Sequence, residues 1–106
     1  MEHEFKVEVE DGDVIVAGSD GLFDNLFEEN IIEIVNKVTG SIGRYPYWVA
    51  SMIAESAKII SKDKYLTTPF SLEAKMAGCR HSGGKIDDIT VLVAFVVSSH
   101  HHSLDF

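Results

Sequence analysis

Residues 14–25 read VIVAGSDGLFDN, and this stretch decides the expected fold. The apolar run Val14–Ala17 predicts a strand that is buried on both faces, as in the middle of a sandwich. Asp20 and Asp24 follow this strand, and Gly21 lets the backbone turn sharply between them. Carboxylates at the mouth of a buried strand, with a glycine that clears space beside them, suit a hard divalent cation. The stretch therefore predicts a strand that ends in a cation site, with an ordinary Asp-Gly turn as the alternative.

A second acidic cluster lies directly before the longest apolar run of the chain. Residues 83–97 read GGKIDDITVLVAFVV, and Ile89–Val97 is expected to form the final strand. The adjacent carboxylates of Asp87 and Asp88 repel each other, and a nearby cation would relieve that repulsion. Because side chains alternate along a strand, an inward Ile89 would send Asp88 outward and Asp87 inward. Asp87 is therefore the better ligand candidate, and solvated charges at the entrance of a strand are the alternative.

The remaining patterns predict an α+β fold with mainly antiparallel strands. Alternating apolar residues predict a strand over Phe5–Val9, which a hairpin turn at residues 11–13 joins to the strand from Val14. Helical spacing of apolar residues predicts one helix over Glu28–Val38 and a second from Pro46 or Tyr47 to Ser61. The irregular, polar segment 61–76 is expected to contain a short helix over Ser71–Ala77. Asn25 is expected to cap the first helix or an initial turn, and Gly40 to end the helix in a left-handed conformation.

Composition narrows the classes of function. The chain of 106 residues is at most one domain, and a hydrophobic content of 45% is typical of a globular protein. Seventeen acidic residues against nine basic ones give a formal net charge of −8, which argues against nucleic acid and anionic membranes as partners. Cys79 is the single cysteine, so an intramolecular disulfide is excluded. No apolar stretch reaches the ~20 residues of a membrane helix, and we expect a soluble, intracellular chain.

The other chemistry-bearing side chains indicate no second site. His3 and His81 are isolated in the sequence, and each is expected to be a polar surface residue. His100–His102 are neighbours in a tail, where histidines rarely converge on one ion. Cys79 lies two residues from His81, but no phosphate-cradling loop ending in Arg follows it, so a cysteine nucleophile is not expected.

Together and in this order, the two acidic motifs resemble the metal-dependent serine/threonine protein phosphatases of type 2C. Thr68–Ser71 is similar to the segment before the second motif in a subgroup with plant, mitochondrial and plastid-associated members. The resemblance spans Phe5–Val97 and matches the C-terminal part of the catalytic domain. It implies the C-terminal portion of the type 2C β-sandwich flanked by helices, over residues 1–98, with residues 99–106 as a disordered tail.

The resemblance also implies a chemistry. Members of the family hold a two-metal centre of Mg²⁺ or Mn²⁺, and a metal-activated water hydrolyses phosphoserine and phosphothreonine in proteins. Asp20 and Asp87 would each bind one metal directly. Asp24 matches a position that helps to hold an additional metal, Gly21 would give close backbone passage beside the site, and Asp88 would lie behind the ligands. The implied partner is a phosphorylated protein.

The sequence also departs from the family pattern. The N-terminal half of the family supplies a phosphate-binding arginine and an Asp-Gly whose carboxylate bridges both metals, and nothing in Met1–Asp13 matches them. Two hypotheses follow: the family activity, present as a truncated C-terminal part, or a catalytically silent fragment that pairs or competes with an intact phosphatase. Uncovered strands would favour a complementary phosphatase segment or self-association. The compartment stays open, with mitochondrion or plastid implied only by the subgroup.

Overall fold

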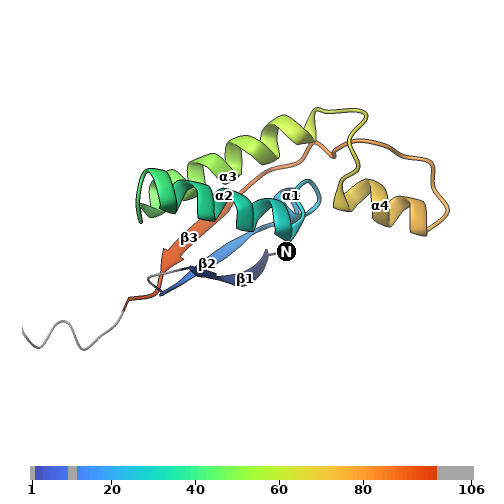
Figure 1. Cartoon of the computed structure of the whole chain (residues 1–106). Helices are drawn as coiled ribbons and strands as arrows, with labels where there is room; N and C mark the ends of the chain where they lie inside the picture. The colour runs from blue at the N-terminus through green and yellow to red at the C-terminus, as the bar shows by residue number, and fades with distance from the viewer. Residues whose placement is uncertain (1, 10–11, 98–106) are drawn as a thin grey trace, which may run out of the picture.

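The described strands form one antiparallel sheet (Figure 1). The structure is a computed structural model that describes residues 2–9 and 12–97. The sheet has the order β1-β2-β3, and its strands are β1 (Glu2–Val9), β2 (Gly12–Ser19) and β3 (Val91–Phe95). Both pairings, β1 with β2 and β2 with β3, are antiparallel. The predicted α+β class and strand direction are confirmed, and the second sheet of a sandwich is not among the described residues.

The first two strands form a hairpin, as predicted, but Gly12 and Asp13, which were expected in its turn, belong to the strand β2. Val9 pairs with Gly12, so the register leaves residues 10 and 11 between the strands, and these two lie outside the described part of the chain. Gly12 has φ +130°, a backbone conformation that residues with a Cβ rarely adopt. The same register places His3 opposite Gly18 at the far end of the hairpin. The register thus aligns the first described residues of the chain with the first acidic motif.

Four helices complete the described chain, and α2 and α3 lie along one face of the sheet (Figure 1). They are α1 (Asp20–Phe23), α2 (Glu28–Ser41), α3 (Pro46–Ser61) and α4 (Pro69–Met76). The helix α4 stands apart from the α2–α3 layer, beside the segment that returns to β3 (Figure 1). None of the helices among the described residues is long and apolar enough to cross a membrane.

The ends of two helices differ from the expectation. The helix α2 has Phe27 as its N-cap, not Asn25, and it continues through Gly40 instead of ending there. Gly43, with φ +125°, takes the positive φ that was expected of Gly40. The helix α4 begins before Ser71, because Thr68 and Ser71 form a capping box around its first turn.

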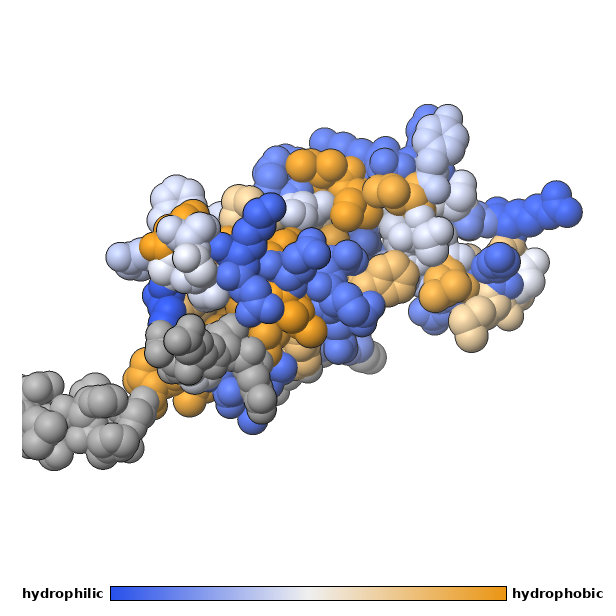
Figure 2. Space-filling view, viewed as in Figure 1, coloured by the Kyte–Doolittle hydropathy of each residue, from blue (hydrophilic) through white to orange (hydrophobic). Residues whose placement is uncertain are grey.

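The final strand β3 is shorter than the predicted span Ile89–Val97, since residues 84–90 have no regular secondary structure. Apolar side chains remain exposed where the chain leaves β3 (Figure 2), and Val97 is 65% exposed. The loop before β3 is held by side-chain hydrogen bonds from Ser19 and Asn25 instead of a neighbouring strand.

The hydrophobic core lies between the sheet and the two long helices. Its buried members come from the inner face of β1 and β2, from the apolar stripes of the helices and, with Leu26, from the segment between α1 and α2: Val7, Val14, Val16, Leu22, Leu26, Ile31, Val35, Val38, Val49, Ile53 and Ala57. Burial alternates along β2, so Ile15 and Ala17 are only half-buried. On β3, Leu92 is 60% exposed. The burial of β2 on both faces that the sequence predicts is therefore seen on one face only.

Candidate functional site

The strand β2 delivers the first acidic motif directly into a helical turn. Ser19 ends the strand and Asp20 begins α1. Gly21 is buried, and a Cβ at this position would overlap the carbonyl oxygen of Asp88. The backbone of the second acidic motif therefore passes directly over the glycine of the first. Any larger residue at position 21 would push the two motifs apart.

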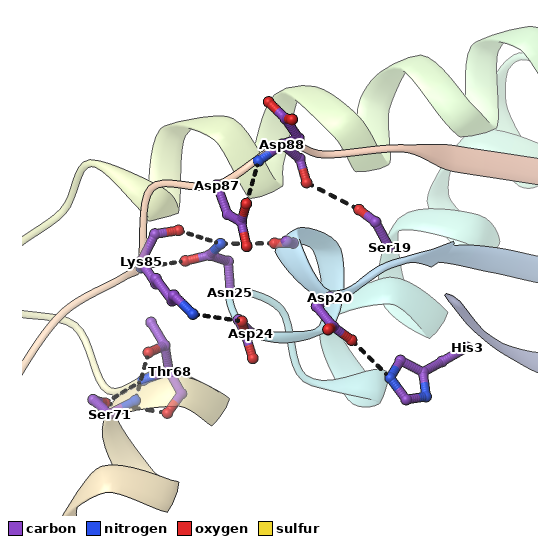
Figure 3. Close-up of polar contacts among 11 residues, drawn as sticks. His3, Ser19, Asp20, Asp24, Asn25, Thr68, Ser71, Lys85, Asp87 and Asp88 are labelled. Carbon is purple, nitrogen blue, oxygen red and sulfur yellow. Dashed lines mark hydrogen bonds and ion pairs between the residues drawn. The ribbon is translucent and has the colours of Figure 1, made fainter. Parts of the chain in front are cut away.

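Ser19 fixes the second motif to the end of β2. Its backbone N–H donates to the carbonyl oxygen of Thr90 at 3.1 Å, and its Oγ accepts from the backbone N–H of Thr90 at 3.0 Å. The same hydroxyl donates to the carbonyl oxygen of Asp88 at 3.0 Å (Figure 3). These bonds extend the pairing of β2 and β3 beyond the strands themselves and hold the aspartate loop in place.

Asn25 joins the two motifs from the other side. Its side chain is 2% exposed, and its Nδ2 donates to the carbonyl oxygens of Gly21 at 2.7 Å and Lys85 at 2.9 Å. Its Oδ1 accepts from the backbone N–H of Lys85 at 2.8 Å (Figure 3). A Cβ on Gly84 would lie 2.7 Å from that Oδ1, so a glycine lets the loop approach Asn25. The amide therefore acts as a clip between segments 60 residues apart.

Three carboxylates gather around this clip. The Asp87 carboxylate points toward the turn that carries Asp20 and Asp24, whereas the Asp88 carboxylate points away from it (Figure 3). An Oδ1 of Asp87 accepts from the backbone N–H of Asp88 at 2.8 Å. Asp20 accepts from Nε2–H of His3 at 2.9 Å. The structure thus brings Asp20, Asp24 and Asp87 to one side of the molecule and turns the side chain of Asp88 elsewhere.

The pKa of Asp24 reflects its position among these carboxylates. Partial burial raises the pKa of the Asp24 carboxyl above its ordinary value near 3.8. The Lys85 ammonium, with Nζ 3.8 Å from Oδ2 of Asp24, opposes the rise in pKa. The negative charges of Asp20 and Asp87 reinforce the rise in pKa. Asp24 therefore lies within the field of both predicted ligands, where a bound cation would be favourable.

The helix α4 supports the site from the side. The backbone N–H of Phe70 donates to the carbonyl oxygen of Asp24 at 2.9 Å, and the Nζ of Lys85 lies 5.2 Å from the centre of the Phe70 ring. Thr68 is fully buried, and its Oγ1 donates to the carbonyl oxygen of Gly83 at 2.7 Å. The capped start of α4 therefore positions both the turn after α1 and the loop before Asp87.

The donor set is of the right chemical kind for a hard cation but is incomplete. Carboxylate oxygens are the ligands that Mg²⁺ and Mn²⁺ prefer. Within residues 2–9 and 12–97, however, no group of three or more His, Cys, Asp or Glu side chains lies close enough to hold a metal ion. The described residues thus fit part of a coordination shell.

Sequence reasoning missed three contributors to the site: His3, Asn25 and Lys85. His3 comes close to the first motif through the hairpin register, which sets position 3 opposite position 18, whereas the turn predicted at residues 11–13 would have given another register. Asn25 was expected to cap a helix, and its actual partner lies far along the chain. Lys85 had no local signal, since its contact with Asp24 depends on tertiary packing.

Comparison with known proteins gives the chain its family. No protein-family model matches it. It is 46% identical over 97 residues to "Probable protein phosphatase 2C 80" of Arabidopsis thaliana, which covers 90% of this chain and 23% of the relative. It is 49% identical over 96 residues to "Probable protein phosphatase 2C 55" of the same plant, with 90% and 20% covered. A relative from Oryza sativa subsp. japonica, "Probable protein phosphatase 2C 71", is 41% identical over 96 residues, again with 90% and 20% covered.

A solved structure agrees with these relatives. The X-ray structure of the photosystem II phosphatase PBCP matches with a TM-score of 0.70 and 35% sequence identity, over 85% of this chain and 38% of that chain. The fold is thus that of a phosphatase domain. The chain belongs to the type 2C protein phosphatase family. It spans between 13% and 33% of the length of these and other curated relatives it matches, which fits the prediction that it corresponds to one part of the catalytic domain.

Proposed function

We propose that this chain supplies part of the active site of a metal-dependent serine/threonine protein phosphatase. The observation that carries the proposal is the clip at Asn25, which holds the loops of Asp20 and Asp87 together with their carboxylates on one side. The similarity to several type 2C phosphatases supports the same reaction class. The substrate class is a phosphorylated protein.

In this proposal Asp20 and Asp87 each provide a carboxylate ligand to Mg²⁺ or Mn²⁺. When bound, the paired cations would neutralise phosphate oxygens and acidify the attacking water. His3 orients the carboxylate of Asp20 through its Nε2–H. Asp24 provides a carboxylate for an additional cation, within the electrostatic field of the Asp20 and Asp87 carboxylates.

Two further residues shape the site without binding metal. Gly21 gives the backbone of Asp88 room to pass, and the carbonyl of Asp88 is held by the hydroxyl of Ser19. The bridging aspartate and the phosphate-binding arginine of the family match no residue of this chain. We place those groups on a complementary phosphatase segment, which would complete the metal shell.

The direct test is hydrolysis of a phosphothreonine peptide with Mn²⁺, alongside calorimetric titration of Mn²⁺ into the chain. We expect Asp20→Asn and Asp87→Asn to weaken Mn²⁺ binding and to abolish any hydrolysis. Glu33→Gln removes an exposed carboxylate on α2, away from both motifs, and serves as the matched control. Mn²⁺ binding that is equal in all four proteins would overturn the assignment of the ligands.

The alternative of a catalytically silent fragment is decided by the same assay. Hydrolysis that depends on Asp20 and Asp87 in the purified chain excludes it. If the purified chain binds Mn²⁺ but hydrolyses the peptide only after a complementary phosphatase segment is added, the proposed division of the active site is supported. No contact among the described residues favours the silent fragment over the family activity.

A further inference from the structure

Positive charge in this acidic chain is concentrated in one segment. Residues 58–85 contain six of the nine Lys and Arg residues but only two of the 17 Asp and Glu residues, a formal charge of +4. The chain as a whole carries −8, so the other residues carry −12. The segment runs from the last turn of α3 through α4 to the loop before Asp87. An anionic ligand is therefore repelled by most of the molecule and attracted at one place.

The segment folds around a cavity of about 350 Å³, which we call the basic groove. Its lining residues include four basic side chains and one aromatic ring: Lys62, Lys64, His81, Lys85 and Phe70. The one carboxylate of the lining, Asp63, is turned to the backbone, where its Oδ1 accepts from the N–H groups of Tyr65 at 2.7 Å and Leu66 at 3.0 Å.

Two cations of the basic groove, Lys62 and Lys64, are available to a ligand, whereas Lys85 faces the Asp24 carboxylate. Lys62 and Lys64 are exposed, and within the described part of the chain neither forms an ion pair. The ring of Phe70 forms a flat apolar wall, with the His81 ring edge-on at 4.7 Å. A wall of this kind between ammonium groups suits the extended backbone of a peptide with anionic side chains.

The basic groove adjoins the candidate metal ligands. Lys85 belongs to its lining and also lies 3.8 Å from Asp24, measured from Nζ to Oδ2 (Figure 3). Phe70 donates its backbone N–H to the carbonyl oxygen of Asp24. Ile86, the last residue of the lining, directly precedes Asp87. A peptide in the groove therefore passes beside the carboxylates.

We propose that the basic groove binds an anionic group that neighbours the phosphorylated residue of the substrate, either carboxylates or a second phosphate. This inference rests on the proposed phosphatase function and adds a substrate preference to it. Substrates with acidic or multiply phosphorylated sequences are bound in preference to neutral ones. Lys64 and Lys62 supply the recognition, and Lys85 links the groove to the catalytic side.

The test is fluorescence anisotropy with labelled phosphothreonine peptides in EDTA, so that divalent metals make no contribution. Three peptides carry, beside the phosphothreonine, three Glu residues, three Gln residues or a second phosphoserine. We expect the Glu and phosphoserine peptides to bind more tightly than the Gln peptide. The tighter of these two identifies whether carboxylates or phosphate are preferred.

Charge-reversal variants locate the binding. Lys64→Glu and, as a second variant, Lys62→Glu are expected to weaken binding of the anionic peptides about three- to tenfold at low salt, and the Gln peptide hardly at all. Lys37→Glu makes the same charge change at an exposed site on α2 and is expected to leave the affinity within about twofold. The proposal for the groove would be overturned if Lys64→Glu and Lys37→Glu weakened peptide binding equally, or if the Glu and Gln peptides bound equally well.

Failure of the groove and failure of the phosphatase function give different results. One result would be peptide binding in EDTA that depends on Lys64, together with Mn²⁺ binding that is unchanged by Asp20→Asn and Asp87→Asn. It would support the groove as a binding site and contradict the proposed metal site. The other result would be Mn²⁺ binding that depends on Asp20 and Asp87, together with equal binding of the three peptides. It would support the metal site and contradict the groove.

Discussion

The side chain of Asn25 accepts from the backbone N–H of Lys85 at 2.8 Å and donates to the carbonyl oxygen of the same residue at 2.9 Å. Both bonds are shielded from water, because Asn25 is 2% exposed. One buried amide thus satisfies both backbone groups of a residue 60 positions away. The distance between the two acidic motifs depends on this pairing.

Removal of the Asn25 amide should therefore loosen the loop that carries Asp87. We expect Asn25→Ala to lower the free energy of unfolding by about 1–3 kcal/mol, since the N–H of Lys85 is left without its partner. Amide hydrogen exchange at Lys85 should accelerate. Asn36→Ala on the exposed face of α2 is the control, and it should be neutral or stabilising because Ala favours helix. Unchanged exchange at Lys85 would contradict the role of the clip.

Two glycines should respond to the same substitution with opposite signs. A Cβ on Gly21 would overlap the carbonyl oxygen of Asp88, so Gly21→Ala should destabilise by about 1–3 kcal/mol. Gly40 lies inside α2, where an added methyl group would meet no atom within 4 Å, and its φ is not positive. Gly40→Ala should therefore stabilise by about 0.5–1 kcal/mol. Urea unfolding measures both, and a stabilising Gly21→Ala would mean that the two motifs do not touch.

The ionised carboxylate of Asp24 should lower the stability of the fold and raise its affinity for Mn²⁺. Burial raises the pKa of its carboxyl, so the folded chain holds the proton more tightly than the unfolded chain. Stability therefore falls as pH rises from the unfolded pKa through the raised folded pKa. We expect Asp24→Asn to raise the free energy of unfolding at pH 7 and to lose this advantage below the unfolded pKa. Calorimetry should show weaker Mn²⁺ binding.

Asp63 provides a control of opposite sign. The backbone N–H groups of Tyr65 and Leu66 lower the pKa of Asp63, so its ionised form stabilises the fold above the unfolded pKa and that contribution is lost as pH falls through the folded pKa. Asp63→Asn should therefore lower the free energy of unfolding at pH 7 without changing Mn²⁺ binding. The free energy of unfolding of both variants, Asp24→Asn and Asp63→Asn, is measured at several pH values. If Asp24→Asn lowers the free energy of unfolding at pH 7, the raised pKa of Asp24 is contradicted.

The open face of the sheet should drive association of the isolated chain. Leu92 is 60% exposed on β3, which lies at an edge of the described sheet. We expect Leu92→Ser to reduce concentration-dependent self-association in sedimentation velocity. Ile59→Ser on α3 removes a side chain that is 62% exposed but lies away from the sheet. If both variants reduce association equally, the sheet face is not the contact.

The elements with strong local periodicity were predictable from the sequence. The helix α3 spans Pro46–Ser61, so it begins at the first of the two predicted start residues, Pro46 or Tyr47, and ends at the predicted Ser61, because its apolar stripe and Pro46 are local signals. Gly40 was misjudged as the end of α2, since Ile42 and the turn after it still bond to Val38 and extend the helical path. The short helix α1 had no periodic signal, because four residues are too few to show one.

The candidate site was predictable in part. The motifs identified Asp20 and Asp87, and the structure brings their loops together, although their role as ligands stays a prediction. The orientation of Asp88 depends on the hydroxyl of Ser19, which lies 69 residues before it. No local pattern reports such a contact.

The sequence by itself determined the existence of the three strands and of the three longer helices, the antiparallel hairpin and the resemblance to the phosphatase family, because periodicity, turn residues and motif order are local properties of the chain. Only the tertiary structure decided that Asn25 clips the two acidic loops, that His3 reaches Asp20, and that the lysines before Asp87 surround one groove. The reason is physical. These contacts join residues far apart in sequence, and they form only when the core between the sheet and the helices aligns the loops.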